Sequence, residues 1–194
     1  MKGKEIIDNF SKQHEIIIIT KKNKNIKKKK LKNIQIEFCS VSESAIISII
    51  KKHVPDIVIN LVVFGGLKKC EENPIEAFTV NVYGMLNIIN GCLETKAKLI
   101  FLSSREVYGE TQGKASTEDE KMKPKNILGI TKMLGENLII NAAENSNLEF
   151  TILRITNVYG ENMKSGIYQM IKNSIDNNKI IINGGRQFLN LIHV

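Results

Sequence analysis

A short apolar run at residues 99–102, LIFL, ends abruptly in Ser103 and Ser104. A run of this length with polar boundaries is typical of a strand that is buried on both faces of a parallel sheet. Doubly wound sheets bind their ligands at the carboxyl ends of such strands. The run therefore predicts a central strand that delivers two hydroxyl groups to a functional site, although a pair of serines in this position can also cap a helix.

Apolar strands and amphipathic helices alternate on both sides of this run. We expect helices at 4–12, 44–52, 74–93, 126–143 and 166–177, and strands at 16–19, 34–38, 56–63, 150–153, 179–182 and 191–194. The connections between them are short, which favours an α/β fold with a doubly wound parallel sheet. Three loops at carboxyl ends of strands are then of interest, at 62–66, 103–110 and 156–161.

The two longest predicted helices have apolar positions at helical spacing. In the helix at 74–93 the stripe expected to be buried includes Phe78, Met85 and Leu86, and in the helix at 126–143 it includes Leu134 and Leu138. Asn81 lies in the middle of the first of these helices, where asparagine is unfavourable. We therefore expect Asn81 to make a buried hydrogen bond to a neighbouring strand.

Composition limits the partners of the chain. No apolar run approaches the roughly 20 residues needed to cross a bilayer, so we expect a soluble protein with no membrane partner. The three cysteines have no CxxC or Cys/His spacing, which predicts reduced thiols in a cytoplasm and no metal site. The net charge of +8 is concentrated at 21–32, without the aromatic residues that stack on bases. A solvated loop is the favoured interpretation, and a nucleic-acid partner is the weaker alternative.

Several motifs occur in the order found in extended short-chain dehydrogenases/reductases. They are DIVINLVV, TVNVYGMLN, SSREVYG, NILGITK, LRITNVYG and GGRQFLNLIHV, and together they extend over nearly the whole chain. The chain thus resembles the nucleotide-sugar epimerases and dehydratases, typified by UDP-glucose 4-epimerase. The resemblance implies a Rossmann-like fold, NAD-dependent hydride transfer on a nucleotide-sugar, and a homodimer formed through the helices that contain Asn81 and Lys132.

The resemblance also assigns roles to residues at the catalytic end. Ser104 matches the serine or threonine that hydrogen-bonds the sugar hydroxyl, and Lys132 matches the lysine that binds the nicotinamide ribose and lowers the pKa of a catalytic tyrosine. The position of that tyrosine is occupied by Leu128. Loss of a positioned acid/base group typically costs about 10²- to 10⁴-fold in rate. Asn157 matches a residue near the substrate diphosphate, and Glu106 matches an acid of the dehydratases, although Arg105 before it departs from their pattern.

The cofactor end departs further from the family pattern. Of the GxxGxxG turn that receives the cofactor pyrophosphate, only the third glycine has a counterpart, Gly3. Val62 stands in the pair of small residues that lies beside the cofactor. Thr20 replaces the aspartate that binds the adenosine ribose, and Lys21 follows it, so a 2′-phosphate and hence NADP is an alternative to NAD.

In the family the first strand lies between the strands that correspond to 16–19 and 56–63 here, and this chain has no counterpart for it. The two neighbouring edges must then pair with each other or remain open. We expect a single incomplete NAD(P)-binding domain, truncated at both ends, with a core at 1–160 and the start of the substrate-binding part at 161–194. Two functions remain open: an impaired nucleotide-sugar epimerase/dehydratase, or a non-catalytic remnant or interaction module.

Overall fold

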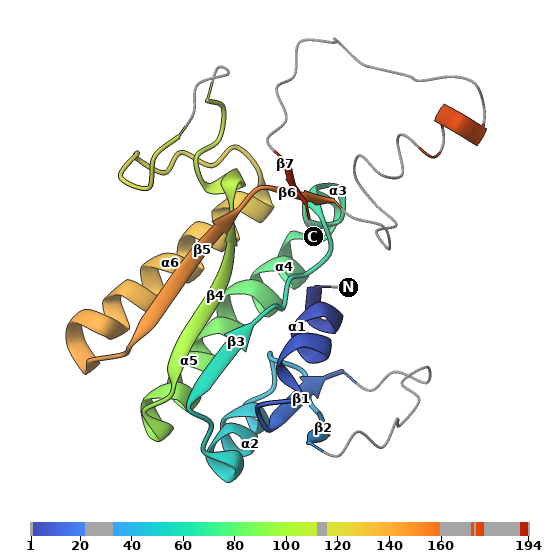
Figure 1. The fold of residues 1–194 in the computed structure, drawn as a ribbon. Helices are drawn as coiled ribbons and strands as arrows, with labels where there is room; N and C mark the ends of the chain where they lie inside the picture. The colour runs from blue at the N-terminus through green and yellow to red at the C-terminus, as the bar shows by residue number, and fades with distance from the viewer. Residues whose placement is uncertain are drawn as a thin grey trace.

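The computed structural model describes residues 2–21, 33–111, 116–159, 172, 174–176 and 191–193, and helices alternate with strands along them (Figure 1). The α-helices are α1 (Lys2–Phe10), α2 (Ala45–His53), α3 (Leu67–Glu72), α4 (Pro74–Phe78), α5 (Gly84–Thr95) and α6 (Ile127–Ser146). The strands are β1 (Ile16–Thr20), β2 (Ile34–Phe38), β3 (Ile57–Asn60), β4 (Lys98–Ser104), β5 (Phe150–Ile155), β6 (Asn157–Tyr159) and β7 (Leu191–His193). Within these ranges no helix is long and apolar enough to cross a membrane.

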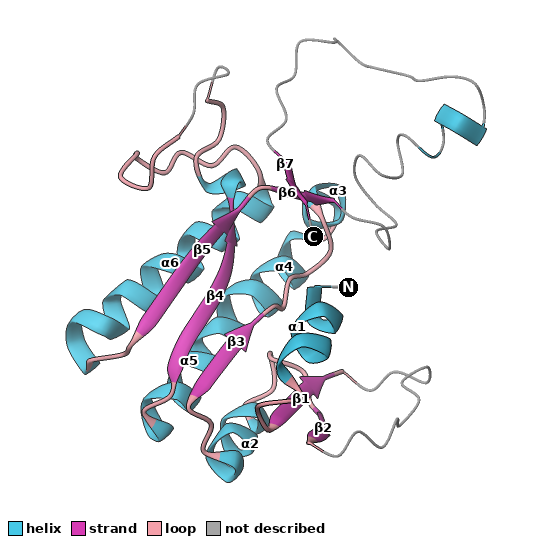
Figure 2. Ribbon diagram, in the orientation of Figure 1, coloured by secondary structure: helices cyan, strands magenta, loops and turns pink. Residues whose placement is uncertain are grey.

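All strand pairs are parallel, as the alternation of helices and strands predicts. β4 lies between β3 and β5, with Leu99 opposite both Val58 and Phe150. β1 pairs with β2, and β6 pairs with β7. In Figure 2 the strands follow one another in the order β5, β4, β3, β1 and β2. β1 and β3 do not pair with each other, so among the strands that the structure describes the two edges that the sequence predicts to pair or to stay open have no partner.

The core lies between β4 and the helices on one face of the sheet. Side chains of β4 alternate, so that Leu99 and Phe101 are fully buried while Ile100 and Leu102 on the other face are only half-buried. Leu99 and Phe101 pack in one cluster with Met85 of α5 and Ile139 of α6. The central strand predicted from the LIFL run is therefore confirmed, and its buried face is the face that the helices cover.

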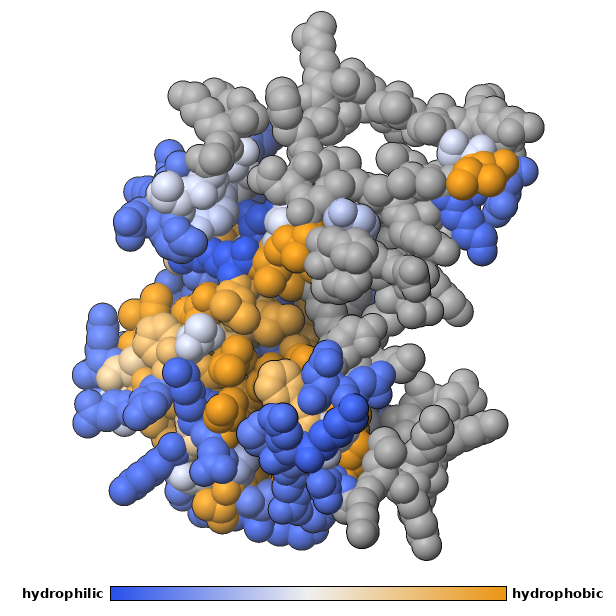
Figure 3. All heavy atoms as spheres, in the orientation of Figure 1, coloured by the Kyte–Doolittle hydropathy of each residue, from blue (hydrophilic) through white to orange (hydrophobic). Residues whose placement is uncertain are grey.

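The opposite face of the sheet is apolar and open. Ile57 and Ile59 of β3 are 51% and 40% exposed, and Leu153 of β5 is 44% exposed. Figure 3, drawn in the same orientation as Figure 1, shows hydrophobic side chains gathered over these strands. Parallel sheets are normally covered on both faces, so this surface is unusual for a sheet of this kind.

The predicted helix at 74–93 is interrupted by a π-helical segment, Thr79–Tyr83. The wider π turn changes which residues face the core, and Phe78 and Leu86 are each 38% exposed. The prediction that both are buried is therefore wrong, whereas Met85 is buried as expected. Asn81 lies within this segment.

Other differences from the predicted elements are local. The strand predicted at 56–63 is limited to β3, and the next residues form a loop followed by α3, which was not predicted. Leu134 and Leu138 of α6 are half-buried, because the most buried face of this helix carries Thr131, Lys132, Gly135, Glu136 and Ile139. Residues 157–159 form strand β6 and not a loop. The strand predicted at 179–182 and most of the helix predicted at 166–177 lie outside the described residues.

We expect the stability of the fold to decrease at alkaline pH through Cys92. This residue of α5 is fully buried, and burial raises the pKa of its thiol from 9.0 to about 12. A thiol whose pKa is higher in the folded state stabilises the fold fully below the unfolded pKa, and this contribution is lost as the pH rises toward the folded pKa. Denaturant titrations between pH 8 and 11 should show a steeper loss of unfolding free energy in the wild type than in Cys92→Ala, by up to about 1.4 kcal/mol per pH unit. Parallel curves for the two proteins would rule out this role.

Candidate functional site

The carboxyl end of β4 presents its two serines to opposite faces of the sheet. Ser103 is buried on the helix side, and its hydroxyl donates to the carboxylate of Glu136. Ser104 is half-buried, and its hydroxyl oxygen accepts a hydrogen bond of 3.3 Å from the backbone N–H of Glu106. This bond caps the 3₁₀ turn Arg105–Val107. Ser104 therefore caps a helical turn, and because the capping bond uses an acceptor, its hydroxyl proton can still be donated to a ligand.

Lys132 is buried on the face of α6 that packs against β4. Its side chain is 5% exposed, its ammonium group donates to the backbone carbonyl of Leu102 at 2.7 Å, and its Nζ lies 4.5 Å from the centre of the Phe101 ring. Leu102 is two residues before Ser104 on β4. The structure thus brings Lys132 and Ser104 to the same end of one strand, although they are 28 residues apart in the sequence.

Leu128 lies one helical turn before Lys132, in the first turn of α6. It is half-buried, and its side chain has no group that exchanges a proton. The turn is fixed by Asn126, whose side-chain oxygen accepts from the N–H of Gly129 at 2.8 Å and whose amide donates to Glu106 at 2.7 Å. Arg105 also lies 3.3 Å from the carboxylate of Glu106. The acid predicted as an alternative proton donor is therefore used to hold the start of α6.

We expect Gly129→Ala to destabilise the fold. A Cβ atom at this position would collide with the backbone carbonyl oxygen of Glu106 and would lie 2.9 Å from Cβ of Pro124. Alanine gains about 1 kcal/mol in helix propensity, but overpacking against backbone costs typically about 1–3 kcal/mol. Urea denaturation should show a lower free energy of unfolding for Gly129→Ala than for the wild type. Gly66→Ala should leave it almost unchanged, because no atom lies within 4 Å of the added Cβ. Equal effects of the two substitutions would contradict the close approach.

Asn81 connects the loop after β3 to α6. Its side-chain oxygen accepts from the N–H of Phe64 at 2.8 Å, and its amide donates to the hydroxyl of Thr131 at 3.0 Å. Asn81 is buried and makes a hydrogen bond across elements, as its position in the sequence predicts, but the partners lie in a loop and a helix and not in a strand. Because Thr131 precedes Lys132, this pair of bonds helps to hold the lysine in place.

A buried ion pair, not found by the sequence analysis, holds β4, β5 and α6 together. The Arg154 guanidinium of β5 donates to both carboxylate oxygens of Glu136, which is fully buried, at 2.8 to 3.2 Å. It also donates to the Tyr108 hydroxyl and to the backbone carbonyl of Glu118, each at 2.8 Å. Hydrogen bonding to Glu136 raises the pKa of Arg154 above its ordinary value. The ion pair thus ties the connector after β4 to the strand that carries Ser103 and Ser104.

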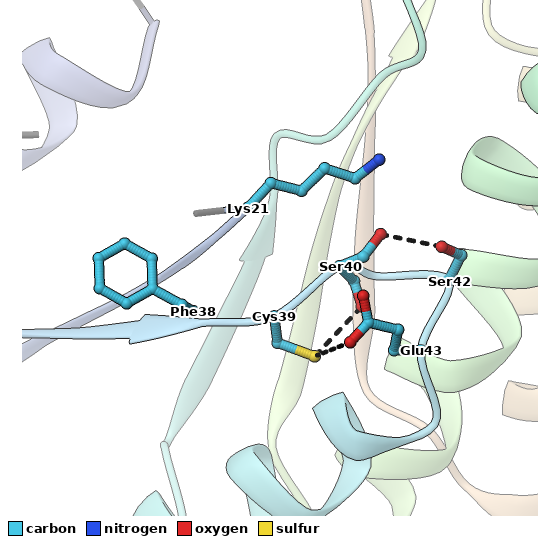
Figure 4. A pocket seen from close by; sticks show the side chains of 6 residues that line it. All are labelled: Lys21, Phe38, Cys39, Ser40, Ser42 and Glu43. Carbon is cyan, nitrogen blue, oxygen red and sulfur yellow. Dashed lines mark hydrogen bonds between the residues drawn. The ribbon is translucent and has the colours of Figure 1, made fainter. Parts of the chain in front are cut away.

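A cavity of about 500 Å³ lies at the carboxyl ends of β1 and β2. Figure 4 shows that the hydroxyls of Ser40 and Ser42 meet in it, 2.8 Å apart, and that the Cys39 thiol faces Glu43. Burial, together with the charge of Glu43, raises the pKa of this thiol. The lining residues are Lys21, Phe38, Cys39, Ser40, Ser42 and Glu43. The cavity offers hydroxyl groups, one anion and one cation at the edge where doubly wound sheets bind nucleotides.

A second cavity, of about 590 Å³, lies next to the end of β4, on the side of β5. Arg105, Tyr108, Thr156 and Ile192 of β7 are among the residues that line it. Asn157, the predicted substrate residue, directly follows Thr156 and begins β6, where it pairs with Leu191. The cavity therefore has polar side chains and an arginine beside the carboxyl ends of β4 and β5.

The remaining predicted cofactor residues lie on α1 and in the loop after β3. Gly3 is the second residue of α1, and Val62 lies in the loop after β3, where it is 36% exposed and donates its N–H to Asn60 at 3.0 Å. Among the residues that the structure describes, no group of three or more His, Cys, Asp or Glu side chains could hold a metal ion.

Comparison with known proteins adds three findings. A model of the NAD dependent epimerase/dehydratase family matches residues 1–194. The chain is 34% identical over 164 residues to UDP-glucose 4-epimerase of Mycoplasma genitalium, a match that covers 80% of this chain and 44% of the relative. Its fold is similar to a UDP-N-acetylglucosamine 4-epimerase from Methanobrevibacter ruminantium, with a TM-score of 0.87 at 22% identity, over 100% of this chain and 66% of that one.

A further similar structure is the UDP-glucose 4-epimerase of Thermus thermophilus in complex with NAD. Its TM-score is 0.83 at 19% identity, over 100% of this chain and 67% of that chain. The chain thus spans less than half of the Mycoplasma relative and about two thirds of the similar structures.

Proposed function

This chain belongs to the NAD dependent epimerase/dehydratase family, and we propose that it binds a nicotinamide cofactor and a nucleotide-sugar, with turnover limited by Leu128. The observation that carries the proposal is that Lys132 donates to the backbone carbonyl of Leu102, two residues before Ser104, at the carboxyl end of β4. Ser104 and Lys132 both match the family pattern, and both lie where such a sheet binds ligands. Epimerisation is favoured over dehydration because Glu106 is engaged at the start of α6.

The residues fit the two ends of the cofactor. The cavity at Ser40 and Ser42 has the size and the hydroxyl groups for adenosine, where Glu43 favours the ribose hydroxyls of NAD and Lys21 would favour the 2′-phosphate of NADP. Lys132 would hold the nicotinamide ribose, and Gly3 and Val62 would flank the pyrophosphate and the cofactor cleft. The cofactor, when bound, supplies the acceptor for a hydride from a sugar carbon.

The substrate would lie between β4 and the second cavity. Ser104 would donate its hydroxyl proton to the sugar oxygen and so orient it, and Arg105, which lines the second cavity, would supply donors for the diphosphate. The family pattern places Asn157 near the same diphosphate. The ammonium group of Lys132 stabilises negative charge that develops on the sugar oxygen. No side chain at position 128 accepts the proton, so this step is slower by about 10²- to 10⁴-fold than with a positioned base.

The homodimer and the cytoplasmic location predicted from the sequence are part of the same proposal. Tyr83, in the π-helical segment, and Leu86, in α5, are 51% and 38% exposed. Such side chains supply an apolar surface for a second copy.

A non-catalytic interaction module is the second candidate. The edge of β3, which is apolar and has no second strand partner among the described residues, favours it. Cofactor binding separates the two functions. An interaction module has no requirement for NAD, and it would retain its partner after substitution of Lys132.

We expect NAD⁺ to bind the chain saturably at concentrations up to about 1 mM, equivalent to about 4 kcal/mol of binding free energy. Lys132→Met keeps the apolar stem of the side chain over Phe101 but removes the charged donor, and should weaken binding by about tenfold or more. Lys51→Met is the matched control, because Lys51 is half-exposed and paired with Glu94 on the surface. Isothermal titration calorimetry measures the NAD⁺ affinity of the wild type and of the two variants. Absence of binding of both NAD⁺ and NADP⁺ at millimolar concentration would refute the proposed function.

A further inference from the structure

The first cavity combines charged and hydroxyl groups from the ends of two neighbouring strands. Lys21 directly follows β1, and Ser40, Ser42 and Glu43 follow β2. All four line the cavity, which has a volume of about 500 Å³. β1 and β2 are parallel and paired, so their carboxyl ends meet at one edge of the sheet. The cavity therefore offers one cation, one anion and two hydroxyl groups to a ligand at this edge.

The two charged groups lie on different sides of the hydroxyl pair. In Figure 4 the hydroxyls of Ser40 and Ser42, 2.8 Å apart, lie between the ammonium group of Lys21 and the carboxylate of Glu43. The Cys39 thiol donates to that carboxylate at 3.9 Å. One serine hydroxyl donates to the other, and the second hydroxyl keeps its proton for a further acceptor. A ligand in the cavity thus meets a cation and a hydroxyl donor on one side, and an acceptor on the other.

We propose that this cavity selects NADP over NAD: Lys21 and the Ser40–Ser42 pair bind a 2′-phosphate on the adenosine ribose, and Glu43 accepts from the 3′-hydroxyl. The inference rests on the proposed function, which places the adenosine end of the cofactor in this cavity. A phosphate monoester carries a charge of about −1.5 to −2 at pH 7 and has three strong acceptor oxygens. An ammonium group and a hydroxyl donor complement such a group.

The side chains at the end of β1 favour the phosphate over a free 2′-hydroxyl. In doubly wound folds a carboxylate accepts from the 2′-hydroxyl of NAD, whereas a nearby cation accommodates the 2′-phosphate of NADP. β1 ends in Thr20, whose hydroxyl donates to the backbone carbonyl of Lys21 at 3.4 Å. The next side chain is the ammonium group of Lys21. Glu43, from the loop after β2, is the one carboxylate among the lining residues, and it can accept from one ribose hydroxyl while Lys21 binds the phosphate on the other.

The test uses the full chain and two cofactor fragments without the nicotinamide half, adenosine 2′,5′-bisphosphate and adenosine 3′,5′-bisphosphate. The two isomers have the same charge, so general attraction to a basic protein affects both equally. We expect isothermal titration calorimetry to show at least tenfold tighter binding of the 2′,5′ isomer. Equal affinities of the two isomers would overturn the proposal, because they would assign the binding to net charge alone.

Three variants test the assigned contacts. Lys21→Met keeps the apolar stem and removes the charge, and should weaken binding of NADP⁺ at least tenfold while changing the affinity for NAD⁺ less than twofold. Ser42→Asp places a carboxylate beside Ser40, and should make NAD⁺ the tighter ligand. Lys51→Met is the matched control and should leave both affinities unchanged, because Lys51 pairs with Glu94 on the surface. Equal losses in Lys21→Met and Lys51→Met, or an unchanged preference in Ser42→Asp, would contradict these contacts.

Titration of the wild type with the two complete cofactors separates this inference from the proposed function. We expect NADP⁺ to bind at least tenfold more tightly than NAD⁺. Equal or tighter binding of NAD⁺ overturns the 2′-phosphate site and leaves the proposed function standing. Absence of binding of both cofactors at millimolar concentration overturns both.

Discussion

Leu128→Tyr is expected to raise turnover of a nucleotide-sugar by about 10²- to 10⁴-fold. Residue 128 lies one turn before Lys132 on α6, so a phenol there projects from the same side of the helix as the ammonium group. A neighbouring positive charge favours the phenolate and makes it a better base. Ser104 at the end of β4 would hydrogen-bond the same sugar oxygen. Epimerisation of UDP-glucose at saturating NAD⁺ is the measurement.

Leu128→Phe is the matched control for this gain. It adds the same ring without the hydroxyl group, so it reproduces any effect of packing in the first turn of α6. We expect Leu128→Phe to have the turnover of the wild type. If it gains as much as Leu128→Tyr, the effect comes from packing and not from proton transfer.

Removal of the Arg154 guanidinium is expected to destabilise the chain by about 3–5 kcal/mol. Arg154→Met leaves the fully buried carboxylate of Glu136 without the guanidinium that pairs with it, while the Ser103 hydroxyl still donates to it. Burial of an uncompensated charge is more costly than loss of the pair itself. Guanidinium chloride denaturation measures the loss.

Two further variants separate this effect from loss of packing. Glu136→Gln combined with Arg154→Met removes both charges and should recover part of the stability lost in Arg154→Met alone. Lys51→Met removes one partner of the half-exposed ion pair with Glu94, and should cost at most about 1 kcal/mol. A loss in Arg154→Met no larger than in Lys51→Met would contradict the structural role of the buried pair.

The sequence predicted the parts of the fold that depend on local pattern. The LIFL run predicts β4, and the roles that the family motifs assign to Ser104 and Lys132 stay predictions, although both residues lie at the carboxyl end of that strand. The alternative that the serine pair caps a helix is met by Ser104, which caps the 3₁₀ turn after β4. These features are encoded in short stretches, where the residue type alone indicates whether a side chain is buried.

The parts that the sequence did not predict depend on contacts between distant residues. Glu136 and Arg154 are 18 residues apart, and Glu136 and Ser103 are 33 apart, so no periodicity connects them. Glu136 does lie four residues after Lys132 on the buried face of α6, which was an available signal. Asn81, within the π-helical segment, makes tertiary hydrogen bonds to Phe64 and Thr131, and helical spacing alone does not indicate the segment. Whether β1 and β3 pair with each other is likewise decided by packing.

A single-turnover experiment with Leu128→Tyr, NAD⁺ and UDP-glucose, followed by the absorbance of reduced nicotinamide, tests whether Ser104 and Lys132 form a hydride-transfer site that lacks only its base. We expect reduced nicotinamide to form at least about 10²-fold faster than in the wild type. We also expect Lys132→Met in the same background to abolish this gain. Formation at the wild-type rate in Leu128→Tyr, with cofactor bound, would contradict the assignment of this site.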